Sequence, residues 1–362
     1  MKKDLKPLIP KYNRRGNKIH TRNRKKNLII SYKSGSHKVK LITPNKLNLD
    51  KKFFEGLGLA KGDGLNYPSI TNPHFNFSNT DFKLIKKVQL WLKRFKLNNL
   101  SYYLILPNSQ ETNNNFILNL INFLKIKPNK LKIYYKDRTK QPNIIIQVNN
   151  AAFQLIYLNL FSKLKNYIFK NNFARRSFLS GIFAAEGHVK HSIYGTIENI
   201  IFCFNANKEK ELAKFIKKCL EKEGIYSKIK IKNKSSLIVY FTDYNNLLKF
   251  FLIGGLESSL KKKTKFINLI QKSKIDIHTK SECLKLLKIN QNNIAKKLNC
   301  SQPNISRILK RRSITLDYIK KIPKLKSILT IKNIRYITIS NSYIKSQELI
   351  KLLLKLKKTS SF

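Results

Sequence analysis

The sequence predicts a mixed α/β fold in which an αββαββα unit occurs twice, followed by a small all-α unit. Helical and strand patterns recur in the same order over residues 46–168 and 169–275. Each series opens with a helix of small residues that ends in one carboxylate. A length of 362 residues with 42% hydrophobic residues allows two or three buried cores.

The charge of the chain is its most unusual property. It contains 74 Lys and Arg against 19 Asp and Glu, which gives a formal net charge of +55. Such a chain repels itself unless a polyanion neutralises it, so nucleic acid is the expected partner. An AT-rich genome would account for part of the lysine excess. It would not account for the scarcity of Asp and Glu, whose codons are not GC-rich.

Other partners and compartments are less favoured. The sequence has no long apolar run, and "MKKDLKPLIP" lacks the apolar core of a signal peptide, so we expect no membrane partner. The four cysteines are scattered, which indicates a reducing interior rather than a disulfide framework or a zinc knuckle. We therefore expect an intracellular protein, in a prokaryotic cytoplasm (archaeal included) or an organelle matrix. The cysteines are Cys203, Cys219, Cys283 and Cys300.

Residues 1–45 are polar and basic and show little apolar periodicity. We interpret them as an extended arm, with a strand at "NLIISY" (27–32). A flexible tail and an arm that orders on DNA phosphates are both compatible with this pattern.

In the first half, Asp50 is a plausible N-cap for a helix that continues through "FFEGLGLAKG". Alternating Phe75 and Phe77 predict a strand, and helical spacing follows. An insertion over residues 101–128 then precedes a predicted hairpin. The expected elements are a helix at 48–62, a strand at 74–79, a helix at 81–95, hairpin strands at 130–137 and 143–150, and a closing helix at 151–164.

The second half repeats this order without the insertion. Gly224 is the expected C-terminal stop of its middle helix. The expected elements are a helix at 175–187, a strand at 200–207, a helix at 208–224, hairpin strands at 227–233 and 236–243, and a closing helix at 244–255.

The two opening helices contain "GLGLAKGDG" (56–64) and "LSGIFAAEG" (179–187). Small residues stand four apart in each, so they share one helix face. Two such faces allow two helix backbones to pack almost in contact. The small residues are Gly58 and Gly62 in the first helix, and Gly181 and Ala185 in the second.

A carboxylate follows each small-residue face, Asp63 in one helix and Glu186 in the other. If the helices pack side by side, the two carboxylates meet and repel each other. A divalent cation removes that repulsion, and oxygen ligands with open positions suit Mg²⁺. Gly64 and Gly187 would let the chain turn sharply out of each helix.

The two motifs resemble those of the LAGLIDADG homing endonucleases in their single-chain form, over about residues 45–275. The resemblance implies a pseudo-twofold monomer whose two curved sheets lie in the major groove of a long, asymmetric double-stranded DNA site. It also implies Mg²⁺- or Mn²⁺-dependent cutting of both strands, with Asp63 and Glu186 as metal ligands and catalytic residues. This chain departs from the family pattern at Gly56, where Leu is usual, and at Lys61, which we expect to face solvent.

Such sites usually add a basic residue near the attacking water. Lys190 lies four residues after Glu186, and Lys262 follows the second closing helix, where family members tend to carry a lysine. Lys136 is the corresponding candidate in the first half. Because lysines are so numerous, each could equally be solvated or contact a phosphate. His188 and His191 are interpreted as surface or DNA-facing residues rather than metal ligands.

Residues 280–322 resemble a helix-turn-helix DNA-binding domain. Its first helix would pack through Ile294, Ala295 and Leu298, with Asn299 and Cys300 in the turn. Ser301 would cap the second helix, and Ile305, Ile308 and Leu309 would pack it back. In such modules the second helix enters the major groove. The expected base contacts are Gln302, Asn304, Ser306 and Arg307, and the expected phosphate contacts are Lys310, Arg311 and Arg312.

An ordinary helical hairpin is the alternative interpretation of 280–322, and the basic tail over 323–362 predicts no role. For the whole chain, the leading hypothesis is a site-specific endonuclease. An intron RNA maturase on the same scaffold and a non-catalytic helix-turn-helix regulator are the alternatives. No flanking self-splicing segments are recognised, so intron homing by a free-standing chain is favoured over an intein.

Overall fold

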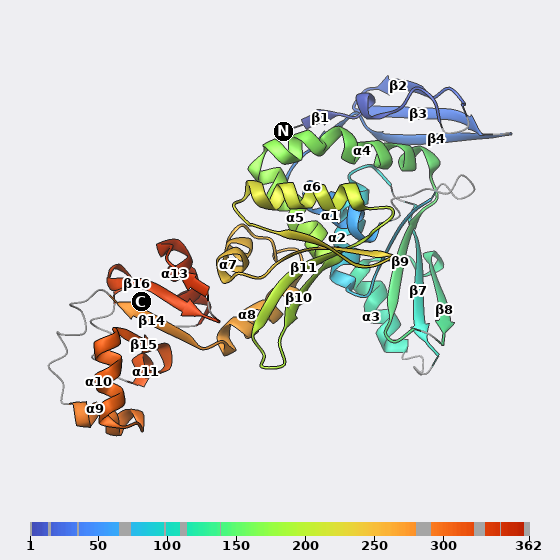
Figure 1. The fold of residues 1–362 in the computed structure, drawn as a ribbon. Coiled ribbons are helices and arrows are strands. Elements are labelled where there is room, and N and C mark those ends of the chain that lie inside the picture. Colours follow the sequence, from blue (N-terminus) through green and yellow to red (C-terminus); the bar gives the residue numbers. More distant parts are fainter. Residues whose placement is uncertain are drawn as a thin grey trace. The chain divides into compact units, whose positions relative to one another are not determined.

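The computed structural model describes residues 2–13, 16–34, 36–64, 74–97, 99–108, 114–137, 139–279, 291–321, 330–340 and 342–357. The chain divides into two compact units, whose elements are labelled in Figure 1. The first comprises Met1–Glu186 with Glu257–Ser259, and the second Gly187–Leu256 with Leu260–Phe362. None of the described helices is both long enough and apolar enough to cross a membrane.

The N-terminal segment forms a sheet, which corrects the expectation of an extended arm and confirms the strand predicted at 27–32. Strands β2 (His20–Arg24), β3 (Asn27–Ser34) and β4 (His37–Pro44) form an antiparallel sheet. Leu28, Ile30 and Leu41 alternate along the strands and are buried, so the sheet has an apolar face of its own. The first unit also contains β1 (Lys2–Asp4), paired with β5 (Lys46–Asn48), and the 3-10 turn Lys6–Leu8.

The first αββαββα-like half follows. Asp50 caps α1 as expected, because its carboxylate accepts a hydrogen bond from the backbone N–H of Phe53 at 2.9 Å. The helices are α1 (Lys51–Asp63), α2 (Phe82–Lys93), α3 (Asn114–Leu124) and α4 (Ala151–Lys170). The strands are β6 (Phe75–Asn79), β7 (Ser101–Pro107), β8 (Leu131–Lys136) and β9 (Asn143–Val148), with a 3-10 turn at Pro128–Lys130.

The predicted hairpin between 130–137 and 143–150 is wrong. The described sheet has the order β6-β9-β7-β8, so β7 lies between the two strands that were expected to pair. Tyr102, Leu104 and Leu106 are buried at alternate positions of β7, as befits an interior strand. The insertion therefore supplies a central strand and α3, and β8 becomes a mostly exposed edge strand.

The second half has the expected hairpin. Its sheet has the order β10-β11-β13-β12, and β12 pairs with β13. Gly224 follows α6 with φ +70°, as expected of a helix stop. The elements are α5 (Asn172–Glu186), β10 (Gly187–His191), β11 (Ile197–Asn205), α6 (Lys210–Lys222), β12 (Lys228–Asn233), β13 (Ser236–Phe241) and α7 (Tyr244–Leu252).

In both halves, the residue directly after the opening helix pairs with the same kind of strand. Gly64, directly after Asp63, pairs antiparallel with Phe77 of β6. Gly187, directly after Glu186, pairs antiparallel with Phe202 of β11. The repeat expected from the sequence is therefore present in the strand pairing that follows each carboxylate.

The unit at 280–322 was expected to be all-helical and instead also contributes β15 to a sheet of order β15-β14-β16-β17. Strand β14 precedes that unit, and β16 and β17 lie in the tail, for which no structure was predicted; isoleucines alternate into the core along β14 and β16. The elements are α8 (Leu260–Lys272), β14 (Ile275–Thr279), α9 (Gln291–Leu298), α10 (Gln302–Arg311), β15 (Ser313–Thr315), α11 (Leu316–Lys321), a 3-10 turn (Ile331–Asn333), β16 (Ile334–Ile339), β17 (Ser342–Ile344) and α13 (Gln347–Leu356).

We predict that acid weakens this C-terminal sheet through His278. Its ring stacks on Tyr336 at 4.2 Å, and burial lowers its pKa below the ordinary 6.5, although Asp276 opposes the shift. The unfolded chain therefore binds the proton more readily, and stability falls as the pH drops below about 6.5. Thermal unfolding of the wild type and of His278→Phe over pH 5–8 checks this. An equal pH dependence in both proteins would contradict it.

Candidate active site

Helices α1 and α5 pack with their backbones nearly in contact, as the small-residue pattern predicted. A Cβ atom placed on Gly58 would lie 2.4 Å from the carbonyl oxygen of Phe178, and one on Gly181 would lie 2.1 Å from that of Glu55. Real Cβ atoms do not approach backbone so closely, so each position accepts only glycine in this packing. The two glycines thus set the separation of the helices.

The same contact brings the C-terminal ends of the helices together. The Cβ position of Gly62 lies 2.4 Å from Cβ of Ala185 and 3.2 Å from Cγ of Glu186. Asp63 is the last residue of α1 and Glu186 the last of α5, and both side chains are half-buried. The two candidate acids therefore stand at neighbouring helix ends.

Asn79, which the sequence analysis did not select, contacts the first of these acids. Its Nδ2 donates a hydrogen bond of 2.5 Å to Oδ2 of Asp63. Asn79 is the last residue of β6 and has the same strand parity as the buried Phe75 and Phe77. That parity is the signal by which the sequence could have revealed it. The amide fixes the orientation of the Asp63 carboxylate.

The last turn of α1 is held by α4. The hydroxyl of Tyr157 donates a 2.6 Å hydrogen bond to the carbonyl oxygen of Ala60. Lys61 does not simply face solvent as expected, because its Nζ lies 5.7 Å from the ring centre of Tyr157 and 5.3 Å from that of Phe161. Gly64 has an ordinary φ of −83°, and close approach requires it, since a Cβ would lie 2.1 Å from the oxygen of Ala60.

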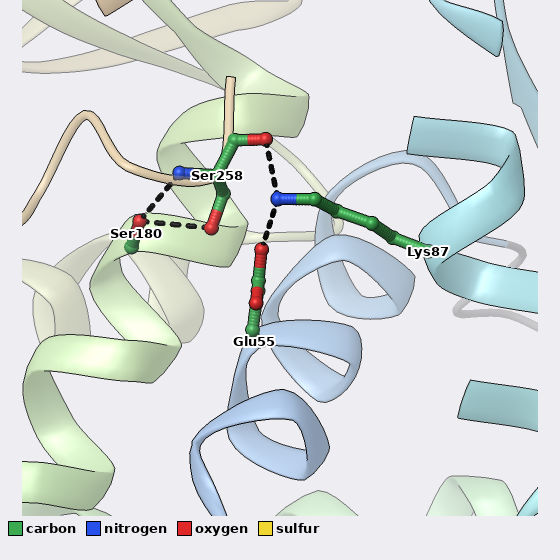
Figure 2. A network of polar contacts seen from close by, with 4 residues as sticks. All are labelled: Glu55, Lys87, Ser180 and Ser258. Atoms are coloured by element: carbon green, nitrogen blue, oxygen red, sulfur yellow. Dashed lines mark hydrogen bonds and ion pairs between the residues drawn. The ribbon is translucent and has the colours of Figure 1, made fainter. Parts of the chain in front are cut away.

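A polar cluster beside the middle of the helix pair joins four segments (Figure 2). Lys87 of α2 donates to the Glu55 carboxylate of α1 and, at 2.9 Å, to the carbonyl oxygen of Ser258. The hydroxyl of Ser180, on α5, lies 2.8 Å from the hydroxyl of Ser258 and accepts from its backbone N–H at 3.0 Å. Both motif helices are thereby fastened to the short segment that precedes α8.

The candidate lysines lie in three different settings. Lys190 pairs with Glu198 on the neighbouring strand at 2.7 Å. Lys136 ends β8, which is three strand spacings from β6, or about 14 Å, so the structure does not bring it to Asp63. Lys262 lies half-buried at the start of α8.

The pKa of His188 shows which lysine charges act at β10. Loss of surrounding water lowers the pKa of His188, and the positive charges of Lys262, Lys265 and Lys232 lower it further. Within the second unit, Lys262 therefore lies near the strand that begins directly after Glu186. His188 and His191 are both exposed on this strand. Among the described residues, no group of three or more His, Cys, Asp or Glu could hold a metal ion.

Helices α9 and α10 are joined by a turn over 299–301, with Asn299 in the left-handed region at φ 50°. Ile294, Ala295 and Leu298 are buried as expected. Ser301 occupies the N-cap position, but its side chain makes no capping hydrogen bond. Ile305 is buried, whereas Ile308 and Leu309 are half-buried. The exposed candidate DNA contacts are Gln302, Asn304, Ser306, Arg307, Lys310 and Arg312, and the side chain of Arg311 lies outside the described parts.

Comparison with known proteins places a LAGLIDADG-like domain at residues 174–254. No curated protein matches the sequence. Solved structures that resemble the chain include I-DmoI in complex with DNA and Ca, at 16% identity over 56% of this chain and 88% of that chain, with a TM-score of 0.32. They also include the N-terminal LAGLIDADG domain of DUF199/WhiA, at 16% identity over 60% and 87%, with a TM-score of 0.34.

Full-length DUF199/WhiA from Thermatoga maritima is similar at 14% identity over 73% of this chain and 90% of that chain, with a TM-score of 0.33. The family match covers the α5 motif and most of the second half, and the first motif lies outside it. The case for the first motif therefore depends on its own residues and contacts.

We predict that Gly58→Ala separates the motif helices. The new methyl group would lie 2.4 Å from a backbone oxygen and 2.8 Å from the backbone nitrogen of Ile182, so the helices must move apart. Overpacking of this kind costs about 1–3 kcal/mol or more. Denaturant unfolding measures the loss, with Asn166→Ala at an exposed position of α4 as the control. Equal stability of the two variants would contradict the close contact.

Proposed function

We propose that this chain is a site-specific, Mg²⁺-dependent endonuclease that cuts both strands of DNA. The observation that carries the proposal is the packing of α1 on α5, which sets Asp63 and Glu186 at neighbouring helix ends. The LAGLIDADG-like domain at 174–254 and the net charge of +55 support the same function. Both motif helices belong to one chain, so a monomer suffices.

The residues present fit a hard divalent cation. Mg²⁺ or Mn²⁺ prefers oxygen ligands, and Mg²⁺ is commonly bound by one or two carboxylates together with waters and substrate phosphates. Asp63 and Glu186 would hold the ion, and a larger set of protein ligands is not required. When bound, the ion would neutralise charge on the phosphate and lower the pKa of an attacking water.

The chain's own residues would orient the reacting groups. The amide of Asn79 donates a hydrogen bond to Oδ2 of Asp63, so the direction of the other carboxylate oxygen, Oδ1, is fixed. Lys262 is our candidate for stabilising phosphate charge beside the second motif, since its charge reaches the strand that follows Glu186. Lys190 is a weaker candidate because Glu198 neutralises it, and Lys136 is better placed to contact a phosphate at the sheet edge.

The exposed face of α10 would lengthen the recognised site. Gln302, Asn304 and Ser306 are exposed along the helix, where they could reach base edges in the major groove. Arg307, Lys310 and Arg312 are exposed nearby and would contact phosphates. This role would set the sequence preference of the enzyme and leave the chemistry to the motif carboxylates.

The test uses a DNA fragment that joins the two flanks of the gene's own insertion site. We predict that wild type cuts both strands with Mg²⁺ and not with a chelator. Asp63→Asn and Glu186→Gln should each lose about 10²-fold or more of the cutting rate while still binding DNA. Asp137→Asn and Glu211→Gln, at exposed carboxylates, are the matched controls and should cut normally.

Tight binding with no cutting in any metal would overturn the endonuclease proposal for that site. An intron RNA maturase and a non-catalytic regulator would then be the remaining candidates. Replacing the DNA by the intron RNA separates them, because a maturase should prefer the folded RNA and a regulator the duplex.

Asn79 supplies a second prediction. Asn79→Ala removes the amide that orients Asp63, and losses of this kind typically cost about 10–100-fold in activity. Single-turnover cutting rates at saturating protein measure the effect. Asn166→Ala, at an exposed position of α4, is the control. Equal rates for the two variants would show that the Asp63–Asn79 contact has no part in the reaction.

A further inference from the structure

The β2-β3-β4 sheet presents one face on which every charged residue is basic. Leu28, Ile30 and Tyr32 of β3 are buried, and their register partners on β4 include the buried Leu41 and Thr43. The alternate positions therefore point away from this core. Exposed cations occupy five of these outward positions in the described sheet: Arg22, Arg24, Lys33, Lys38 and Lys40.

Nothing in the sequence of this segment neutralises that charge. Residues 5–49 contain neither Asp nor Glu. Lys33 stands directly opposite Lys38 in the antiparallel register of β3 and β4. Like charges directly opposite each other destabilise a sheet. The free protein thus carries an electrostatic cost at this pair, which a polyanion lying on the face would remove.

The composition of the face indicates what kind of polyanion fits. Its remaining described positions on the strands are His20, Asn27, Ile29, Ser31, Ile42 and Pro44, so the face carries one imidazole and none of the larger rings of Phe, Tyr or Trp. Single-stranded nucleic acids are usually bound by stacking their bases on such aromatic rings. A face of cations without those rings is suited to the phosphate backbone of a duplex.

We propose that the outward face of β2-β3-β4 binds the phosphate backbone of duplex DNA, as a surface separate from the motif helices and from α10. Arg22, Arg24 and Lys40 lie in three successive outward rows of the sheet, in which they pair with Ile29, Asn27 and Ser31 of β3. The inference extends the proposed DNA-binding function, and it holds for duplex DNA of any sequence. It places these phosphate contacts on a folded sheet instead of the extended arm expected from the sequence.

The test measures binding without cutting. The full chain carrying Asp63→Asn is titrated with a fluorescent DNA duplex of arbitrary sequence over a series of salt concentrations. Replacing Arg22, Arg24 and Lys40 together by Gln should reduce the slope of log K against log salt by about 2–3, since each lost phosphate contact contributes about 0.9. The matched control replaces Lys83, Lys93 and Lys163, which are exposed on α2 and α4, by Gln.

The control should change the slope by less than about 1. Equal slope changes in the two triple variants would overturn the proposal, because net charge alone would then explain the binding. If the triple variant bound duplex DNA as the parent does and lost affinity only for a duplex RNA of the same sequence, the proposal would be overturned in favour of an RNA partner. The assay measures binding to an arbitrary DNA sequence with cutting disabled. Its result therefore does not depend on whether the endonuclease proposal is correct.

A single substitution should change protein stability and DNA affinity in opposite directions. Lys38→Gln removes the like-charge pair with Lys33, so it should raise the melting temperature of the free protein while weakening its binding to DNA. A variant that fails to fold would lose both properties together. A lower melting temperature, or unchanged DNA binding, would contradict the proposed surface.

Discussion

The near-contact between the backbones of α1 and α5 is the constraint on which the site depends. Gly58 and Gly181 leave no room for a Cβ atom, and Gly62 brings the end of α1 against Ala185 and Glu186. The ends of the helices, and hence the two carboxylates, are placed by backbone packing rather than by flexible side chains. A metal ion at this position would meet ligands held on two rigid helices.

Other contacts of the first unit reinforce that packing. Tyr157 fastens the last turn of α1 through the carbonyl of Ala60, close to Asp63. Lys87 links Glu55 to the backbone of Ser258, and Ser180 binds the same serine, so the middle parts of the two helices are tied together as well. The helix pair is therefore held by polar contacts both at the carboxylate end of α1 and farther from it.

The helix packing could be predicted from the sequence because small residues four apart lie on one helix face, and such a face allows close packing of two helices. It could not predict that β7 separates β8 from β9, since strand periodicity shows which residues form a strand and not which strand is its neighbour. The Ser180–Ser258 bond spans 78 residues and has no local signal. In the N-terminal segment, the strand at 27–32 was predicted, whereas its partner strands β2 and β4, which are rich in charged residues, were not.

The central claim is that Asp63 and Glu186 act as one site. Binding of Mn²⁺, followed by electron paramagnetic resonance in the wild type, Asp63→Asn, Glu186→Gln and the double variant, tests this most directly. Shared ligation predicts that either substitution removes the same binding and that the double variant is no worse than either single one. Losses that add, or binding that survives both substitutions, would show that the two carboxylates do not share an ion.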